Sequence, residues 1–368
     1  MPLRHCFFLV QIHVFFDAFL DTKNMKKIIV LCFLIPFFAV AQRISLPILP
    51  QGASSLGLDN NTPLSEYMNS GWTTEQGLPQ NSVIALCQTH DGYIWIGTQE
   101  GLARFDGAHF TILETSNTPA LKSNYITGLL EDREGTLWIG TNGGGVCRFK
   151  DGVWTTYTTK EGLSNNIVRS LLEDREGGLW IGTNGGGVSR FKNGVFTTYT
   201  VQNGLSNGVV YAMTEDSSGG IWFGTLGGGV CRFSNGVFTT YTEQHGLSNN
   251  IIRSLMCDSK GAVWIGTNGG GVCRFQNGVF TTYTEEHGLA NNRVYALLQD
   301  RNGTIWIGTY GGGLNRFRDG KFDVYSTEHG LLNNNIRSLM EDKDGSLWIG
   351  TNSGGMNRLK SALFTPYW

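Results

Sequence analysis

The stretch LLEDREGGLWIGTNGGGVSRFKNGVFTTYT, from Leu171 to Thr200, decides the fold because close copies of it recur along the chain. The tryptophan of its LWIGT motif marks each copy, and it returns at intervals of 43 and then 42 residues: Trp95, Trp138, Trp180, Trp222, Trp264, Trp306 and Trp348. A fixed period of this length, with several short apolar runs per copy, is typical of a radial β-repeat, whereas helical repeats show a 3.6-residue apolar period. The sequence therefore predicts an all-β protein: a seven-bladed β-propeller of four-stranded antiparallel blades over residues 67–368.

Four short strands can be assigned within one repeat from their β-branched and aromatic residues and from the Gly and Asn clusters between them. In the copy quoted above they are Ile167–Glu173, Leu179–Thr183, Gly187–Phe191 and Val195–Thr200. The turns EDREGG and KNG join the first pair and the last pair of strands. These two turns should lie on one face of the disc, and the connections NGGG and NGLSNN on the other.

Residue size indicates which strand is innermost. The tenth residue before each tryptophan is small in all copies: Ala85, Gly128, Ser170, Ala212, Ser254, Ala296 and Ser338. Seven strands converge on the axis of a propeller, where larger side chains would collide. The tryptophans, one strand further out, should pack between neighbouring blades and bury roughly 200 Å² each. No blade can bury both of its faces alone, so the ring must close.

Closure can be predicted from two extra copies of the fourth strand. The segment Tyr67–Ser82 matches the end of a fourth strand and its following loop, and Trp72 falls where Tyr157 and Tyr199 fall. The chain also ends in LFTPYW, from Leu363 to Trp368. We expect the N-terminal copy to pair with the last blade and cover its edge, with the C-terminal copy as the alternative.

The N-terminal region carries an export signal. From Met25 the sequence MKKIIVLCFLIPFFAVAQ has the basic, apolar and small-residue order of a signal peptide, predicted over residues 25–41. Its apolar run is short for a bilayer span. Residues 1–24 are interpreted as a non-native extension upstream of the true start, and residues 42–66 as a linker. These features predict a periplasmic or secreted protein with no membrane span in its mature form.

Composition excludes some partners. With 28 basic and 30 acidic side chains, the net charge of −2 gives no electrostatic footprint for nucleic acid or an anionic membrane. Five cysteines remain after the signal peptide, an odd number, and three of them share one repeat position. Equivalent positions on different blades lie too far apart for disulfides, so we expect buried free thiols, no metal site and no cofactor.

The repeat also resembles a known family. LWIGTNGGGVCRF and WTTEQGLPQNSVIALCQTHDGYIWIGTQEGLARFDG are similar to the propeller repeats of two-component regulators, the periplasmic input region of hybrid sensor kinases and related diguanylate cyclases. The resemblance covers Tyr67 to Trp368. It implies an exported propeller that senses a ligand or transmits strain, followed in the family by a Tyr-rich β-sandwich, a transmembrane helix and a kinase or cyclase. This sequence shows none of those output motifs, so we expect a stand-alone or truncated input module whose partner is a membrane-bound kinase or cyclase.

A candidate ligand site follows from two repeat positions that vary. Eleven residues before tryptophan stand Ile84, Thr127, Arg169, Tyr211, Arg253, Tyr295 and Arg337; four residues after it stand Gln99, Asn142, Asn184, Leu226, Asn268, Tyr310 and Asn352. Arg goes with Asn, and Tyr with Leu or Tyr, as expected for two positions in contact across an antiparallel pair.

Both positions belong to the glycine-rich face, near the mouth of the channel. The predicted ligand-binding residues are Arg169, Tyr211, Arg253, Tyr295, Arg337, Asn184, Asn268, Tyr310 and Asn352. Guanidinium, phenol and amide groups could hold an oligosaccharide or a small anionic ligand, with further amides from Asn166, Asn250, Asn292 and Asn334. Alternatively these pairs only pack and cap strand ends, because duplication in two-blade units would also produce the alternation.

Other repeated residues favour structure over catalysis. A third-strand arginine recurs in every copy and is interpreted as an ion pair or backbone clamp near the turn aspartates. His245, His287 and His329 share a loop position that accepts other residues elsewhere, which argues against a metal or catalytic role. The favoured function is therefore a non-enzymatic sensory or ligand-binding input module. The alternatives are an extracellular protein-interaction platform and a propeller-scaffold carbohydrate-binding or lyase protein.

Overall fold

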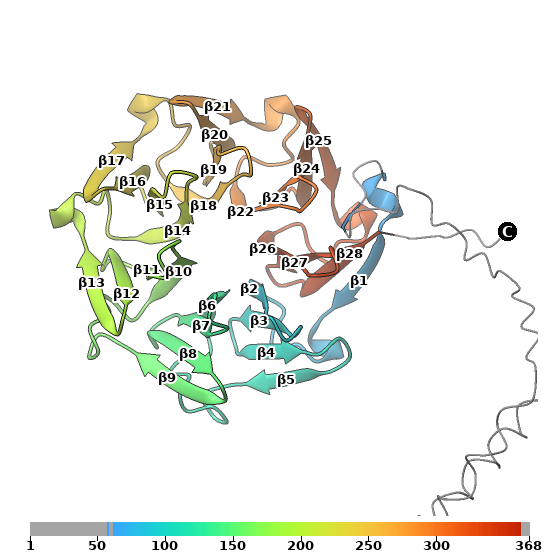
Figure 1. Ribbon diagram of the computed structural model, residues 1–368. Coiled ribbons are helices and arrows are strands. Elements are labelled where there is room, and N and C mark those ends of the chain that lie inside the picture. The colour runs from blue at the N-terminus through green and yellow to red at the C-terminus, as the bar shows by residue number, and fades with distance from the viewer. Residues whose placement is uncertain (1–56, 59–61, 362–368) are drawn as a thin grey trace, which may run out of the picture. The chain divides into compact units, whose positions relative to one another are not determined.

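Seven sheets arranged around an axis form the fold. The computed structural model describes residues 57, 58 and 62–361, with 28 strands and six short 3-10 helices in that part of the chain. The strands form seven four-stranded sheets in which neighbouring strands run antiparallel. Figure 1 shows the sheets placed radially, as the blades of a propeller. The predicted fold is confirmed.

The blades are numbered here in chain order, and their strands are given from the axis outward. They are blade 1, β2 (Val83–Gln88), β3 (Ile94–Thr98), β4 (Leu102–Phe105) and β5 (Phe110–Leu113); blade 2, β6 (Ile126–Glu131), β7 (Leu137–Thr141), β8 (Val146–Lys150) and β9 (Val153–Tyr157); blade 3, β10 (Val168–Glu173), β11 (Leu179–Thr183), β12 (Val188–Lys192) and β13 (Val195–Tyr199); blade 4, β14 (Val210–Glu215), β15 (Ile221–Thr225), β16 (Val230–Ser234) and β17 (Val237–Tyr241); blade 5, β18 (Ile252–Cys257), β19 (Val263–Thr267), β20 (Val272–Gln276) and β21 (Val279–Tyr283); blade 6, β22 (Val294–Gln299), β23 (Ile305–Thr309), β24 (Leu314–Arg318) and β25 (Lys321–Tyr325); and blade 7, β26 (Ile336–Glu341), β27 (Leu347–Thr351), β28 (Met356–Lys360) and β1 (Met68–Trp72).

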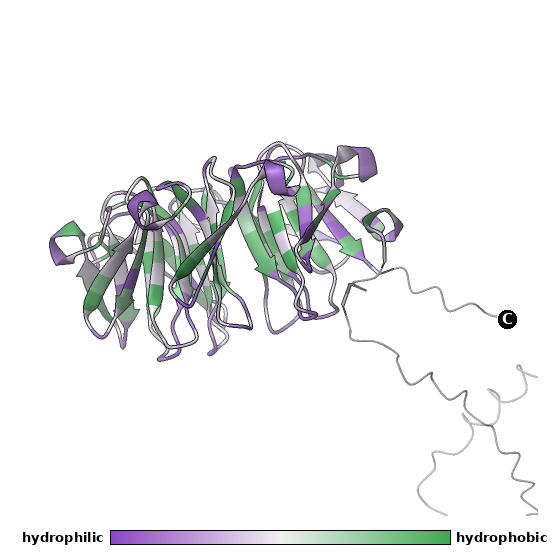
Figure 2. Cartoon of the chain, turned by 90° about the horizontal axis from the view of Figure 1, so that it is seen from above, coloured by the Kyte–Doolittle hydropathy of each residue, from purple (hydrophilic) through white to green (hydrophobic). Residues whose placement is uncertain are grey.

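Short helices lie beside the outermost strands. They are η1 (Leu64–Glu66), η2 (Thr74–Gln76), η3 (Val201–Asn203), η4 (Glu243–His245), η5 (Glu285–His287) and η6 (Thr327–His329). A capping box opens η3, where Thr200 is bonded reciprocally to Asn203, and Gly204 ends the helix at φ 104°. We call the face with helices η2 to η6 and the NGGG loops the loop face, and the face with the EDREGG and KNG turns the turn face; η1 precedes the turn-face end of β1. Seen edge-on in Figure 2, the strands carry most of the hydrophobic residues, and the connections at both faces are largely hydrophilic.

The tryptophans pack between blades, as predicted. All seven are buried, with 0–4% of their surface exposed. Trp138 of blade 2, for example, packs against Val168, Leu179 and Ile181 of blade 3. Each blade is thus completed by its neighbour, and the second strand of every blade is buried along its whole length.

A hydrogen bond to the turn fixes each indole within its own blade. In six blades the Nε1 of tryptophan donates to the turn aspartate at 2.7–2.8 Å, as Trp180 does to Asp174. The other carboxylate oxygen of Asp174 accepts the backbone N–H groups of Glu176 and Gly178. In blade 1, Thr89 replaces the aspartate and accepts from Trp95 at 3.1 Å. The repeated turn therefore holds the indole and closes the hairpin at once.

The N-terminal strand closes the ring. β1 pairs with β28 over five residues, from Met68 opposite Lys360 to Trp72 opposite Met356. The last sheet is thereby completed by the beginning of the chain, as predicted (Figure 1). The competing copy at residues 363–368 lies outside the described residues.

The predicted extension and signal peptide also lie outside the described residues. Of the predicted linker, residues 57, 58 and 62–66 are described, and Leu58 and Leu64 are buried. In the described part of the chain no helix has the length and apolar character needed to cross a membrane. Cys87, Cys147, Cys231, Cys257 and Cys273 are all free thiols, as predicted; Cys147, Cys231 and Cys273 are buried, whereas Cys87 and Cys257 are half-buried, contrary to the prediction.

Candidate ligand-binding collar

A β-bulge repeated in every blade positions the first set of predicted site residues. The innermost strand and its neighbour lose register at one residue, between Val168 and Ser170 in blade 3, and at the equivalent place in each other blade. The skipped residues are Ile84, Thr127, Arg169, Tyr211, Arg253, Tyr295 and Arg337. A bulge residue leaves the ladder and its side chain is re-aimed. We call these seven residues, together with the seven that follow tryptophan by four positions, the collar.

Five of the bulge side chains form one continuous chain of contacts around the axis. The guanidinium of Arg253 lies 4.5 Å from the ring centre of Tyr211 and 5.4 Å from that of Tyr295. Arg169 lies 5.9 Å from the ring of Tyr211, and Arg337 lies 5.0 Å from the ring of Tyr295. Blades 3 to 7 are therefore linked at the loop face by alternating cations and aromatic rings, each worth about 0.5–1 kcal/mol at an exposed site.

The predicted contacts between the two collar positions are present in part. Nε and Nη2 of Arg169 both donate to Oδ1 of Asn184 at 3.3 Å within blade 3. Tyr295 and Tyr310 lie with ring centres 5.6 Å apart in blade 6. Asn268 instead accepts the hydroxyl of Tyr295 from the next blade at 3.3 Å. The packing interpretation of the alternation thus has direct support, and the same contacts pre-organise the polar groups.

The collar is accessible and cationic. Its bulge residues are half-buried, while Leu226 and Tyr310 have 36% and 37% of their surface exposed. The fourteen collar positions hold three arginines and no carboxylate. In the described part of the chain, Nε of Arg253 is buried and has no hydrogen-bond acceptor. A buried donor without a partner costs about 1–3 kcal/mol. A hydrogen-bond acceptor placed at the centre of the collar would therefore be stabilising.

The side-chain oxygens of the four flanking asparagines accept hydrogen bonds from the backbone of their own connections. Oδ1 of Asn166 accepts the backbone N–H of Thr159, and Asn250, Asn292 and Asn334 make the equivalent bond in their blades. Their side-chain carbonyls hold the connection from the outermost strand to the next blade. Their oxygen atoms therefore have a structural role, and a contribution of their amide groups to a ligand site stays a prediction.

The recurring third-strand arginines lie at the turn face. Arg190 bonds to Asp174, and Nε of Arg232 lies 2.6 Å from Asp216, which confirms the predicted ion pair in these blades. Burial alone would raise the pKa of Asp216, but hydrogen bonds from Arg232, Ser218 and Trp222 outweigh it and hold the pKa well below its usual value. In blade 6, Arg316 bonds instead to Asp323.

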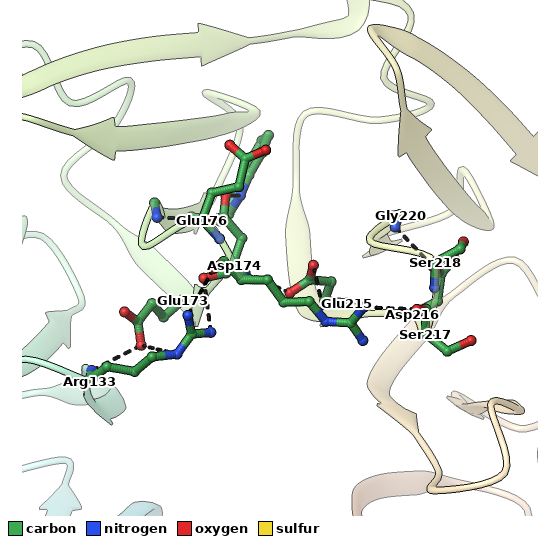
Figure 3. Close-up of polar contacts among 12 residues, drawn as sticks. Arg133, Glu173, Asp174, Glu176, Glu215, Asp216, Ser217, Ser218 and Gly220 are labelled. Carbon is green, nitrogen blue, oxygen red and sulfur yellow. Dashed lines mark hydrogen bonds and ion pairs between the residues drawn. The ribbon is translucent and has the colours of Figure 1, made fainter.

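A second set of turn-face contacts, between blades, escaped the sequence analysis. Just after the turn aspartate or Thr89, a backbone N–H donates to the last side chain of the innermost strand in the next blade (Figure 3). We call the interface between two neighbouring blades a seam. This hydrogen bond occurs in six seams: His90–Glu131, Arg133–Glu173, Arg175–Glu215, Ser259–Gln299, Arg301–Glu341 and Lys343–Gln88. Arg133 adds bonds to the carbonyl oxygens of Asp174 and Arg175. These bonds include the closure seam, so they stabilise the whole ring.

The fold and its sevenfold contacts define the class of protein: a propeller built from one duplicated blade. Within that class the chain belongs to the two-component regulator propeller family. The model of the two component regulator propeller matches residues 77–100, 120–143, 162–185, 204–227, 246–269, 288–311 and 330–353. No curated protein matches the chain.

Several solved structures share the fold. The extracellular domain of the hybrid two component system BT3049 from B. thetaiotaomicron is 24% identical with a TM-score of 0.72, and that of BT4673 from the same organism is 21% identical with a TM-score of 0.66. In both cases 80% of this chain matches 42% of the other, so this chain spans less than half of those domains. An inactive virginiamycin B lyase from Staphylococcus aureus is 16% identical with a TM-score of 0.64, over 80% of this chain and 99% of the lyase. These likenesses show the fold.

Proposed function

We propose that the chain is the exported sensory input propeller of a two-component-type system, and that it binds an oligosaccharide or a small anionic ligand at the collar. Family membership supports an input role, and the signal-peptide pattern over residues 25–41 supports a periplasmic or secreted location. The effector is a membrane-bound kinase or cyclase. The collar offers binding groups rather than a general acid and base, so the propeller itself is not an enzyme.

The observation that carries this proposal is the unpartnered Nε of Arg253 at the centre of the arginine–tyrosine chain. A ligand carboxylate or sulfate would supply the missing acceptor, and a charge-assisted hydrogen bond is about twice as strong as a neutral one. The exposed ring of Tyr310 supplies a flat apolar surface of the kind on which sugar rings stack. An acidic oligosaccharide provides both an anionic acceptor and sugar rings that can stack, whereas a neutral sugar provides no anionic acceptor.

Calorimetric titration tests the site. The purified protein is titrated with uronic-acid oligosaccharides and with neutral oligosaccharides of the same length, alongside a variant with Arg169→Gln, Arg253→Gln and Arg337→Gln. We expect saturable binding of the acidic ligand, preferred at least tenfold over the neutral one, and at least a tenfold loss in the variant.

The control removes three positive charges elsewhere: Lys160→Gln, Lys260→Gln and Lys321→Gln, at exposed positions away from the collar. It should bind as the unmodified protein does. Equal loss in both triple variants would show a nonspecific charge effect. Absence of binding by every acidic sugar and small carboxylate tried would refute a ligand at the collar.

A further inference from the structure

The N-terminal segment fills the groove between blades 6 and 7 at the turn face. Leu58, Leu64 and Tyr67 are buried there, with 2%, 6% and 5% of their surface exposed. They share one apolar cluster with Trp306 and Tyr325 of blade 6 and with Leu347 and Leu359 of blade 7. In Figure 1, η1 lies at the outer rim between β25 and β28. The N-terminal segment is thus an example of a peptide bound between two blades.

Arg316 and Asn302 make the polar contacts with the N-terminal segment. Nη1 of Arg316 donates to the carbonyl oxygen of Thr62 at 2.9 Å and to the hydroxyl of Tyr67 at 3.2 Å. Nδ2 of Asn302 donates to the carbonyl oxygen of Leu58 at 2.8 Å. The segment is therefore held by two leucines, one phenol and two backbone carbonyls, around a single 3-10 turn at Leu64–Glu66, which is a recognition pattern for a short peptide segment.

The register of β1 on β28 explains why the seam between blades 6 and 7 is filled while other seams are open. Met68 pairs with Lys360 as Val195 pairs with Lys192, so Tyr67 stands where Gly194 stands in blade 3. In blade 3 that position belongs to the KNG turn, and the space beside Gly194 is empty within 4 Å. A turn glycine sends no side chain into the seam, whereas the incoming N-terminal segment sends Tyr67.

The seam between blades 2 and 3 is an open groove of about 340 Å³. Blade 2 contributes Trp138, Arg148 and Tyr157, at the positions of Trp306, Arg316 and Tyr325 in the filled seam. Blade 3 contributes, among others, Leu179, Phe191, Lys192 and Gly194. The groove therefore has the same apolar walls as the filled seam, with Phe191 in place of Leu359.

Two polar groups of this open groove have no partner in the described part of the chain. Arg148 lies over the Trp138 ring at 6.0 Å and makes no hydrogen bond or ion pair there. Oγ1 of Thr136 is buried without a partner, on a residue with 1% of its surface exposed. The counterparts of Arg148 in the next two seams, Arg190 and Arg232, are engaged by Asp174 and Asp216. Arg148 is thus available for the role that Arg316 plays.

We propose that the groove between blades 2 and 3 is a docking site for a short peptide segment of a partner polypeptide, bound as the N-terminal segment is bound between blades 6 and 7. The occupant carries a leucine and, three residues later, a tyrosine, and it presents a backbone carbonyl and the phenol hydroxyl to Arg148. This site lies on the face opposite the collar and does not depend on a ligand there.

The experiment uses a peptide with the sequence of residues 57–67, GLDNNTPLSEY, titrated against the purified protein. We expect saturable binding that Arg148→Ala weakens at least tenfold and that Tyr→Ala at the end of the peptide weakens similarly. Arg232→Ala is the matched control, since Arg232 holds the same position but is already bound to Asp216. Hydrogen exchange should show protection of β9 and β12 on binding. Because Arg148 has no hydrogen bond to lose, Arg148→Ala should keep the melting temperature of the unmodified protein.

Three results would overturn the proposal. The first is no saturable binding at millimolar peptide, and the second is binding that Arg148→Ala leaves unchanged, which would place the peptide in another seam. The third is a concentration-dependent dimer of the protein that Arg148→Ala abolishes, because a second copy would then be the occupant rather than a partner.

Discussion

Replacing Trp72 by alanine tests whether the N-terminal strand fastens the ring. Its ring stacks on Trp348 of blade 7 with centres 5.2 Å apart and meets Phe105 of blade 1 edge-on at 5.5 Å. Truncating a fully buried tryptophan costs about 3–5 kcal/mol. Trp72 is half-buried, so we take roughly half of that, about 2 kcal/mol, and add about 0.5–1.5 kcal/mol for each of the two aromatic pairs, which gives about 4 kcal/mol.

The assay is thermal and urea unfolding combined with hydrogen exchange. For a domain of this size, about 4 kcal/mol corresponds to a fall of about 6 °C in melting temperature. Tyr199→Ala is the matched control, because Tyr199 occupies the same position in blade 3 and stacks on Trp180 at 5.4 Å. Both variants should be destabilised, but only Trp72→Ala should speed exchange in β1 and β28. A Trp72→Ala protein that melts within 1 °C of the original would refute closure by β1. If deletion of residues 363–368 then lowered the melting temperature, the C-terminal copy would be the clasp.

Further predictions concern the turns, the thiols and one carboxylate. Gly187→Ala should cost well over about 2 kcal/mol in urea unfolding, since its methyl group would meet the carbonyl oxygen of Tyr199 at a φ of 76°, whereas Gly194→Ala, at a φ of 81° in open space, should cost only about 1–2 kcal/mol. Burial raises the pKa of Cys87 to about 11, so this thiol should not react with a disulfide reagent at pH 8 until the protein unfolds. Reaction of Cys87 at the rate of a free thiol in the folded protein would contradict this. Because the pKa of Asp216 is lowered in the folded state, its stabilisation is present above the ordinary value of 3.8 and is lost as the pH falls below it. Urea midpoints between pH 2.5 and 6 should therefore fall less steeply with acidification in Asp216→Asn, and an unchanged slope would contradict the assignment.

The duplicated part of the fold could be predicted because each feature has its cause within one repeat. Strand bounds agree within one residue in blade 3, since β-branched runs end at turn residues such as Asn193 and Gly194. The seven tryptophans and the small residues on the innermost strands also follow from position alone. Ring closure was predictable because Trp72 repeats the aromatic position of Tyr199.

Features with causes outside one repeat could not be predicted. The acceptor Glu173 recurs as Glu131 and Glu215, but its donor is the backbone N–H of a residue in the previous blade, so no complementary residue type marks the pair. The segment before Tyr67 was interpreted as a linker because it has prolines and no period. Its burial depends on the chain entering blade 7 through β1 at the position where other blades have a hairpin turn.

The bulge gives a physical reason why the collar can vary while the propeller stays intact. A residue within the ladder contributes to strand pairing, but the residues at the bulge are skipped by the register, and this position holds isoleucine, threonine, arginine and tyrosine on different blades. Their contacts with one another are made by side chains alone, as between Arg253 and Tyr211. At the turn face, by contrast, the bonds between blades use backbone donors and the half-buried side-chain oxygen of a Glu or Gln, as at Arg301 and Glu341, and they recur between six pairs of blades. Ring stability therefore depends mainly on the turn face and the buried indoles, and the side chains of the collar can change without loss of strand pairing.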